Sequence, residues 1–191
     1  MTTLTLKSYQ QSALDALATY ARAARIQGPA AAFAQHAGRA YNADAFGPDV
    51  PCVCLRIPTG GGKTVLAAHA VPLLAAEWRG TDAPVAVWLV PSDTIRTQTL
   101  KALQTSGHPY REALEAVYGL SLRVCSLDDV AQVPAPQWGR QAVVIVVATI
   151  QSFRIDDAGQ RNVYSFTEAF EPHFKYALAQ GKGAEGGRDL A

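Results

Sequence analysis

Six consecutive apolar residues, Val143–Ala148, constrain the fold more than any other stretch of this 191-residue chain. A short apolar run without alternation is typical of a strand buried on both faces of a sheet. Similar runs predict buried strands at Cys52–Ile57 and Pro84–Val90, and a further strand at Leu120–Cys125. Strands of this kind need a helical cover, so the fold class depends on what lies between them.

Helical periodicity fills the gaps between the predicted strands. Residues 63–78, 93–104 and 109–118 are predicted helices, and Pro72 should kink the first of them because proline has no N–H to donate. Another helix is predicted over residues 8–26, capped by Ser8. Residues 28–50 are predicted to form a loop with room for one short helix. This alternation predicts an α/β fold with a mostly parallel sheet and helices on both faces.

The composition suits a folded domain and excludes several classes of protein. Hydrophobic residues make up 49% and charged residues 17%, which argues against a disordered chain. The net charge of +1 neither supports nor excludes nucleic acid as a partner. The chain shows no signal peptide and no apolar stretch of ~18 residues, so we expect a cytoplasmic protein with no membrane partner. Cys52, Cys54 and Cys125 are interpreted as reduced core thiols, since further metal ligands are not near them.

A glycine-rich loop, Pro58-Thr59-Gly60-Gly61-Gly62-Lys63-Thr64, lies between a predicted strand and a predicted helix. Consecutive glycines let the backbone turn tightly with its N–H groups inward, and the helix adds free N–H groups and its positive dipole end. This arrangement cradles a polyphosphate. Lys63 would reach the β- and γ-phosphates, and the Thr64 hydroxyl would coordinate magnesium. The sequence therefore predicts a site for a nucleoside triphosphate and magnesium that comprises the whole loop.

The loop departs from the general pattern Gly-x-x-x-x-Gly-Lys-Ser/Thr (Walker A), because Ile57 occupies the place of the first glycine. With that departure the chain resembles the superfamily 2 helicases and translocases of the DEAD/DEAH-box type, whose loop often reads Pro-Thr-Gly-x-Gly-Lys-Thr. Tyr9-Gln10 resembles the opening motif of these proteins, in which the glutamine amide reads the adenine edge. The resemblance implies a RecA-like P-loop domain, with residues 1–50 as a helix and loop preceding a lobe over residues 51–191.

Two further segments resemble motifs on the nucleic-acid face of these helicases. Pro91-Ser92-Asp93-Thr94 follows a predicted strand and opens a helix, where Pro91, Ser92 and Thr94 would contact phosphates, although capping of the helix explains the same residues. Thr149-Ile150-Gln151-Ser152 follows the strand 143–148, and there Thr149 and Gln151 would contact nucleic acid. An ordinary exit from the strand is the alternative.

The run from Trp88 to Leu114 is most similar to the helicase (Res) subunit of type III restriction enzymes. This branch implies an ATP-hydrolysing motor that acts on DNA or RNA. It also implies a second RecA-like lobe in the missing C-terminal part of the same protein, and a methyltransferase subunit as partner.

The acidic Walker B motif of these enzymes is not found. The pairs Asp128-Asp129 and Asp156-Asp157 are interpreted as solvated turns, and Gly181–Ala191 as a loop. We therefore expect an N-terminal fragment that holds an incomplete first lobe and hydrolyses ATP poorly by itself. Two other classes stay open: a P-loop kinase that phosphorylates a small molecule, and a nucleotide-binding module without enzymatic activity.

Overall fold

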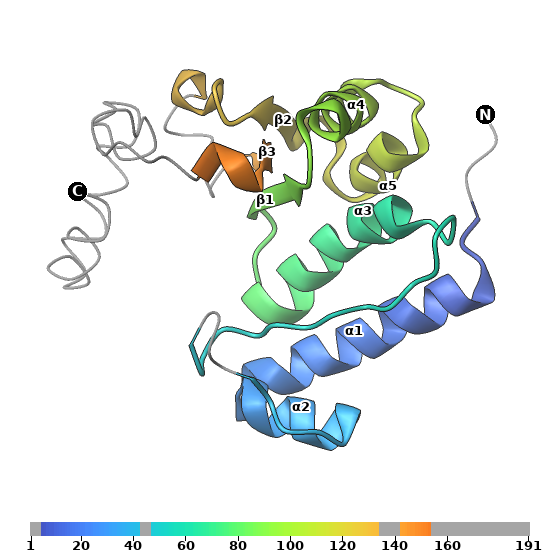
Figure 1. Ribbon diagram of the computed structural model, residues 1–191, viewed down its shortest axis with the longest axis vertical. Helices are drawn as coiled ribbons and strands as arrows, with labels where there is room; N and C mark the ends of the chain where they lie inside the picture. Colours follow the sequence, from blue (N-terminus) through green and yellow to red (C-terminus); the bar gives the residue numbers. More distant parts are fainter. Residues whose placement is uncertain (1–4, 43–46, 134–141, 154–191) are drawn as a thin grey trace, which may run out of the picture. The chain divides into compact units, whose positions relative to one another are not determined.

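The computed structural model describes residues 5–42, 47–133 and 142–153. The chain divides into two compact units, each of which combines separate stretches of sequence (Figure 1). We call Met1–Pro84 with Thr105–Leu120 the helical unit, and Val85–Gln104 with Ser121–Ala191 the sheet unit. Within the described residues, no helix is both long and apolar enough to cross a membrane.

The helical unit is built on α1 (Ser8–Gln27), which packs against α2 (Pro29–Ala37) and α3 (Lys63–Leu74), while α5 (Pro109–Tyr118) packs on α3. Its small core joins α1 to α2 through Tyr20, Ala24 and Ala32, with Phe33 and Trp78 against them. The predicted helices 8–26 and 109–118 and the short helix in 28–50 are confirmed. The cap prediction was wrong by one residue, because Lys7 precedes the helix and Ser8 is its first residue.

The third helix changes geometry after its proline. The helix α3 ends at Leu74 and continues as a single turn of π-helix, η1 (Ala75–Arg79). Pro72 has no N–H to donate, and the N–H of Ala75 is shared between the carbonyls of Val71 and Pro72. The sequence predicted a kink in helix 63–78, and the structure has a π-turn shortly after Pro72. Single π-turns are a known irregularity of helices, and they are among the usual causes of helix kinks.

The predicted strand Cys52–Ile57 was wrong: these residues form no strand, and all of them except Ile57 are exposed. The teal segment in Figure 1 runs alongside α1 as extended chain. A strand needs a neighbouring strand to satisfy its N–H and C=O groups, and the described residues of the helical unit contain no strand. The cysteine prediction fails with it, because Cys52 and Cys54 are exposed and only Cys125 is buried, although all three thiols are free.

In the part of the chain that the structure describes, the sheet unit holds three parallel strands in the order β1-β3-β2. These are β1 (Val85–Val90), β2 (Leu122–Ser126) and β3 (Val143–Thr149), and α4 (Asp93–Gln104) packs on all of them. The central β3 is buried throughout, as its unbroken apolar run predicts. It pairs with β1 from Val85↔Val144 to Val90↔Thr149.

The edge strand β1 differs from the prediction in its burial. Its burial alternates, with Val85, Val87 and Leu89 on the side of the strand that is about half exposed. An apolar run specifies a strand, but only the neighbours in space decide whether both faces are covered. The helix 93–104 and the strands near 120–125 and 143–148 are confirmed. Asp128-Asp129 form the predicted exposed turn, while Asp156-Asp157 and Gly181–Ala191 lie outside the described residues.

Candidate nucleotide and nucleic-acid sites

The glycine loop turns tightly between Pro58 and the first residue of α3. The N–H of Gly61 donates to the carbonyl of Pro58 at 3.0 Å, which closes the turn. Gly60 and Gly62 have φ angles of +77° and +79°, which residues with a side chain rarely adopt. A Cβ on Gly61 would lie 2.6 Å from Cγ2 of Ile57 and 2.9 Å from the Pro58 carbonyl oxygen. Gly60 and Gly62 are therefore required by their backbone conformation, and Gly61 is required because a side chain there would clash.

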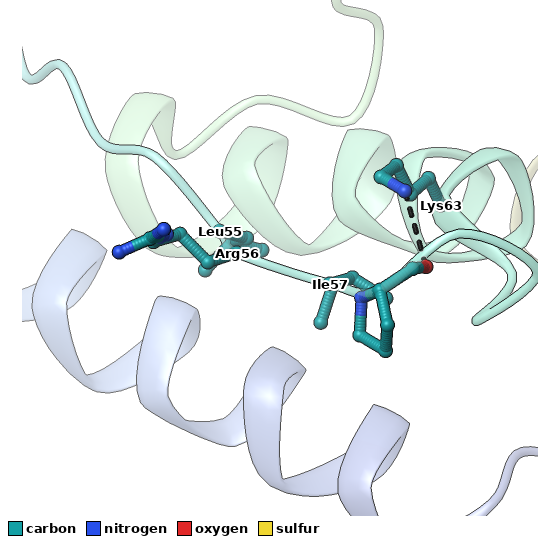
Figure 2. A pocket seen from close by; sticks show the side chains of 5 residues that line it. Leu55, Arg56, Ile57 and Lys63 are labelled. Atoms are coloured by element: carbon teal, nitrogen blue, oxygen red, sulfur yellow. Dashed lines mark hydrogen bonds between the residues drawn. The ribbon is translucent and has the colours of Figure 1, made fainter.

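The polar groups of the loop lie at the start of α3. Gly62 is the residue before the helix, and helix geometry leaves the first N–H groups, beginning at Lys63, without intrahelical acceptors. Lys63 Nζ donates to the Pro58 carbonyl at 3.1 Å (Figure 2), so the ammonium lies over the loop. Thr64 follows in the first turn and is half-buried, while Thr59 is exposed. This geometry suits an anion bound at the helix N-terminus.

A pocket of about 410 Å³ adjoins the loop. Figure 2 shows Lys63 and Arg56 at opposite ends of it, with Ile57 between them. The other lining residues are Leu55 and Pro58. Its two cationic side chains and apolar wall suit a ligand that carries negative charge on an organic body.

The first turn of α1 is tied to the loop. Gln10 Nε2 and the Tyr9 hydroxyl each donate to the carbonyl oxygen of Gly61 at 3.0 Å. Gln10 Oε1 accepts the backbone N–H of Lys7 at 2.8 Å, and the residue is 6% exposed. These bonds join residues more than fifty positions apart in the sequence, and the sequence analysis did not predict that Gln10 contacts the loop. Tyr9 was missed as a loop contact, although its place beside Gln10 at the helix start was the available signal.

The two predicted nucleic-acid segments lie at one edge of the sheet unit. Because Val90 pairs with Thr149 in the parallel sheet, the segments that follow β1 and β3 leave from the same end. Pro91, Ser92 and Thr94 are exposed, and so is Gln151. Thr149 is instead 6% exposed. Its hydroxyl lies 2.9 Å from that of Ser152 and accepts the Ser152 N–H at 3.2 Å.

The start of α4 is capped as well as exposed. Ser92 Oγ accepts the N–H of Ile95 at 3.4 Å, which fits the capping alternative. Arg96 Nε pairs with Asp93 at 2.6 Å, and the pKa of Arg96 is raised mainly by this hydrogen bond, with smaller contributions from Asp128 and Asp129. The edge therefore presents hydroxyls and a helix N-terminus, with an arginine that is already paired to a carboxylate.

A parallel sheet flanked by helices and a glycine loop that opens a helix define a RecA-like P-loop protein. Residues 3–176 match the family described as type III restriction enzyme, res subunit, and the chain belongs to that family. No curated protein and no solved structure matches the chain. The family consists of helicase-like, ATP-dependent motor enzymes, which in general use ATP and Mg²⁺ and act on nucleic acid.

Proposed function

We propose that residues Pro58–Thr64 bind the triphosphate of ATP with magnesium. The observation that carries this proposal is the loop itself, in which two glycines at positive φ and one glycine without room for a Cβ lead into a helix of twelve residues. The backbone N–H groups would hold the phosphates, and Lys63 would exchange the Pro58 carbonyl for β- and γ-phosphate oxygens. Thr64 would supply a hydroxyl to magnesium.

We assign Gln10 two tasks. Its amide donates to the loop carbonyl of Gly61 and accepts from Lys7, and the second N–H and the second oxygen lone pair would pair with an adenine edge. Such an arrangement would make base recognition and the position of the phosphate loop depend on a single side chain. Tyr9 would support the loop through its own bond to Gly61.

We propose that the edge of the sheet unit contacts the backbone of DNA or RNA. Pro91, Ser92, Thr94 and Gln151 are exposed there, and hydroxyl, amide and helix N-terminal groups suit phosphates without reading bases. Thr149 would act through Ser152, since its own hydroxyl is buried. Binding should be indifferent to sequence and should weaken with rising salt.

The whole protein would then be an ATP-driven translocase or helicase, and the family description suggests the motor of a type III restriction system. In this proposal a second RecA-like lobe supplies the arginine that stabilises charge on the transferring phosphoryl group, and an acidic motif positions water. A modification methyltransferase would be its partner subunit.

The deciding experiment measures ATP turnover by the full-length protein with and without DNA. We expect DNA to raise turnover and Lys63→Ala to remove it. Turnover that ignores DNA but requires a small-molecule acceptor would contradict the proposal and support a kinase. Nucleotide binding with no turnover under either condition would support a binding module instead.

A further inference from the structure

The helical unit contains a second pocket, of about 320 Å³, among α1, α2 and the extended segment Val53–Arg56. This volume lies in the range of pockets that hold small molecules. None of the loop residues from Pro58 to Thr64 lines it. Its lining includes Tyr20, Phe33, His36, Arg39, Cys54 and Arg56.

The pocket is basic at its surface and apolar beneath. Arg39, Arg56 and His36 line it and are exposed, and no carboxylate among the described residues lines it. Within the described residues, neither arginine makes an ion pair. An anion is therefore attracted to this site, because no carboxylate among the described residues pairs with either guanidinium group.

The inner part of the pocket is aromatic and aliphatic. The rings of Tyr20 and Phe33 meet edge to face with their centroids 6.0 Å apart, an arrangement that is favourable for rings in contact. The Tyr20 hydroxyl is buried and has no hydrogen-bond partner among the described residues, so burial raises its pKa to about 12. That hydroxyl is covered, and Tyr20 therefore offers its ring rather than its oxygen to the pocket. Leu17 and Leu55 complete the apolar lining.

We propose that this pocket binds a small aromatic anion, a flat ring that carries a carboxylate or a phosphate ester. The ring would lie against Phe33, Leu17 and Leu55, and the anionic group would pair with Arg39 and Arg56. An arginine fork matches either oxyanion with two parallel hydrogen bonds. This pocket shares Leu55 and Arg56 with the pocket beside the phosphate loop, but none of the residues that we propose to bind ATP lines it.

Two cysteines allow a test within one molecule. Cys54 lines the pocket and Cys52 does not, although both thiols are exposed and lie two residues apart. The full-length protein is treated with iodoacetamide, and mass spectrometry follows each cysteine separately, with and without phenyl phosphate. We expect phenyl phosphate at ten times its Kd to slow alkylation of Cys54 by about ten-fold and to leave Cys52 unchanged.

Variants and simpler probes make the test specific. In Arg39→Gln, about ten-fold more phenyl phosphate should be needed to protect Cys54 to the same extent, because a charge-assisted hydrogen bond is lost. Arg79→Gln is the matched control in the same unit outside the pocket, and Lys63→Ala removes the phosphate loop lysine, so both should keep the protection. Benzoate in place of phenyl phosphate shows which anionic group is preferred.

Four results would overturn the proposal: equal slowing of Cys52 and Cys54, no slowing at millimolar probe, loss of protection in Lys63→Ala, or full protection by inorganic phosphate alone. The first would indicate a general change of the extended segment. The third would place the probe at the phosphate loop, and the last would leave the aromatic lining without a role.

Discussion

Gln10 is the residue on which α1 and the phosphate loop both depend. It is almost fully buried, and its amide bonds to Lys7 N–H and to the Gly61 carbonyl. A buried polar group that loses its partner costs about 1–3 kcal/mol, so Gln10→Ala should lower the free energy of unfolding by that order. It should also lower the preference for ATP over GTP more than it weakens triphosphate binding in general.

Gln11→Ala is the matched control, because Gln11 is the next residue and its exposed side chain donates to Asp15 within α1. Competition between ATP and GTP, read together with urea unfolding, separates the two effects. If Gln10→Ala loses stability and the ratio of nucleotide affinities does not move, Gln10 only braces the loop.

Lys63 supplies the positive charge of the phosphate loop. Its ammonium bonds to the Pro58 carbonyl across an exposed turn, so its removal should leave the fold intact. We expect Lys63→Ala to abolish ATP binding while circular dichroism is unchanged. Lys101→Ala, on α4, serves as the matched control in the same nucleotide titration. An unchanged affinity in Lys63→Ala would exclude this loop as the triphosphate site.

At the scale of elements, α3 offers a test of how the chain accommodates a proline. Pro72 costs α3 a hydrogen bond, and the π-turn Ala75–Arg79 follows. A proline inside a helix costs about 3 kcal/mol, so Pro72→Ala should raise the free energy of unfolding by up to that amount. Pro109→Ala is the control, since Pro109 is the first residue of α5, where proline fits.

The measurement for Pro72→Ala is denaturant unfolding with both variants side by side. A loss of stability in Pro72→Ala would mean that the π-turn is required for packing. The packing contact that the π-turn provides would then be the ion pair between Glu77 of the turn and Arg22 of α1, at 2.7 Å.

Local patterns in the sequence predicted the helices closely and the strands unevenly. The helices 93–104 and 109–118 end where predicted because caps and periodicity are local signals. The strand 143–149 was also predictable, since its apolar run needs cover on both faces and the fold supplies it. Cys52–Ile57 has the same appearance, but a strand exists only with a partner at a distance in the sequence.

The site was predictable in its parts and less so in its contacts. The glycine loop and Gln10 were identified from residue type and order, and both lie together in the structure. The burial of Thr149 was not predicted, because its hydroxyl is occupied by Ser152 only once the chain turns after β3. The role of Tyr9 was missed for the same reason, since it depends on a carbonyl at Gly61.

At the scale of the whole molecule, nucleotide and nucleic acid should affect turnover separately. We predict that Thr94→Ala combined with Thr149→Ala in the full-length protein lowers DNA-stimulated ATP turnover and spares ATP affinity. Thr94 is exposed at the start of α4, and Thr149 orders the segment after β3. Thr97→Ala, exposed on the same helix, is the control.

The readout is ATP turnover against DNA concentration at low and high salt, beside an ATP titration without DNA. Stimulation should fall with salt because phosphate contacts release counterions. A double variant that responds to DNA like the wild type, or that loses ATP affinity as well, would place the nucleic-acid track elsewhere.

The extended segment between the two pockets of the helical unit has a practical consequence. Leu55 and Arg56 line both pockets, so they form a common wall. If one ligand shifts this wall, thermodynamic linkage requires each ligand to change the affinity of the other by the same factor. Aromatic carboxylates and phosphate esters in a buffer would then act as effectors, and nucleotide affinities measured in different buffers would differ without any change in the protein.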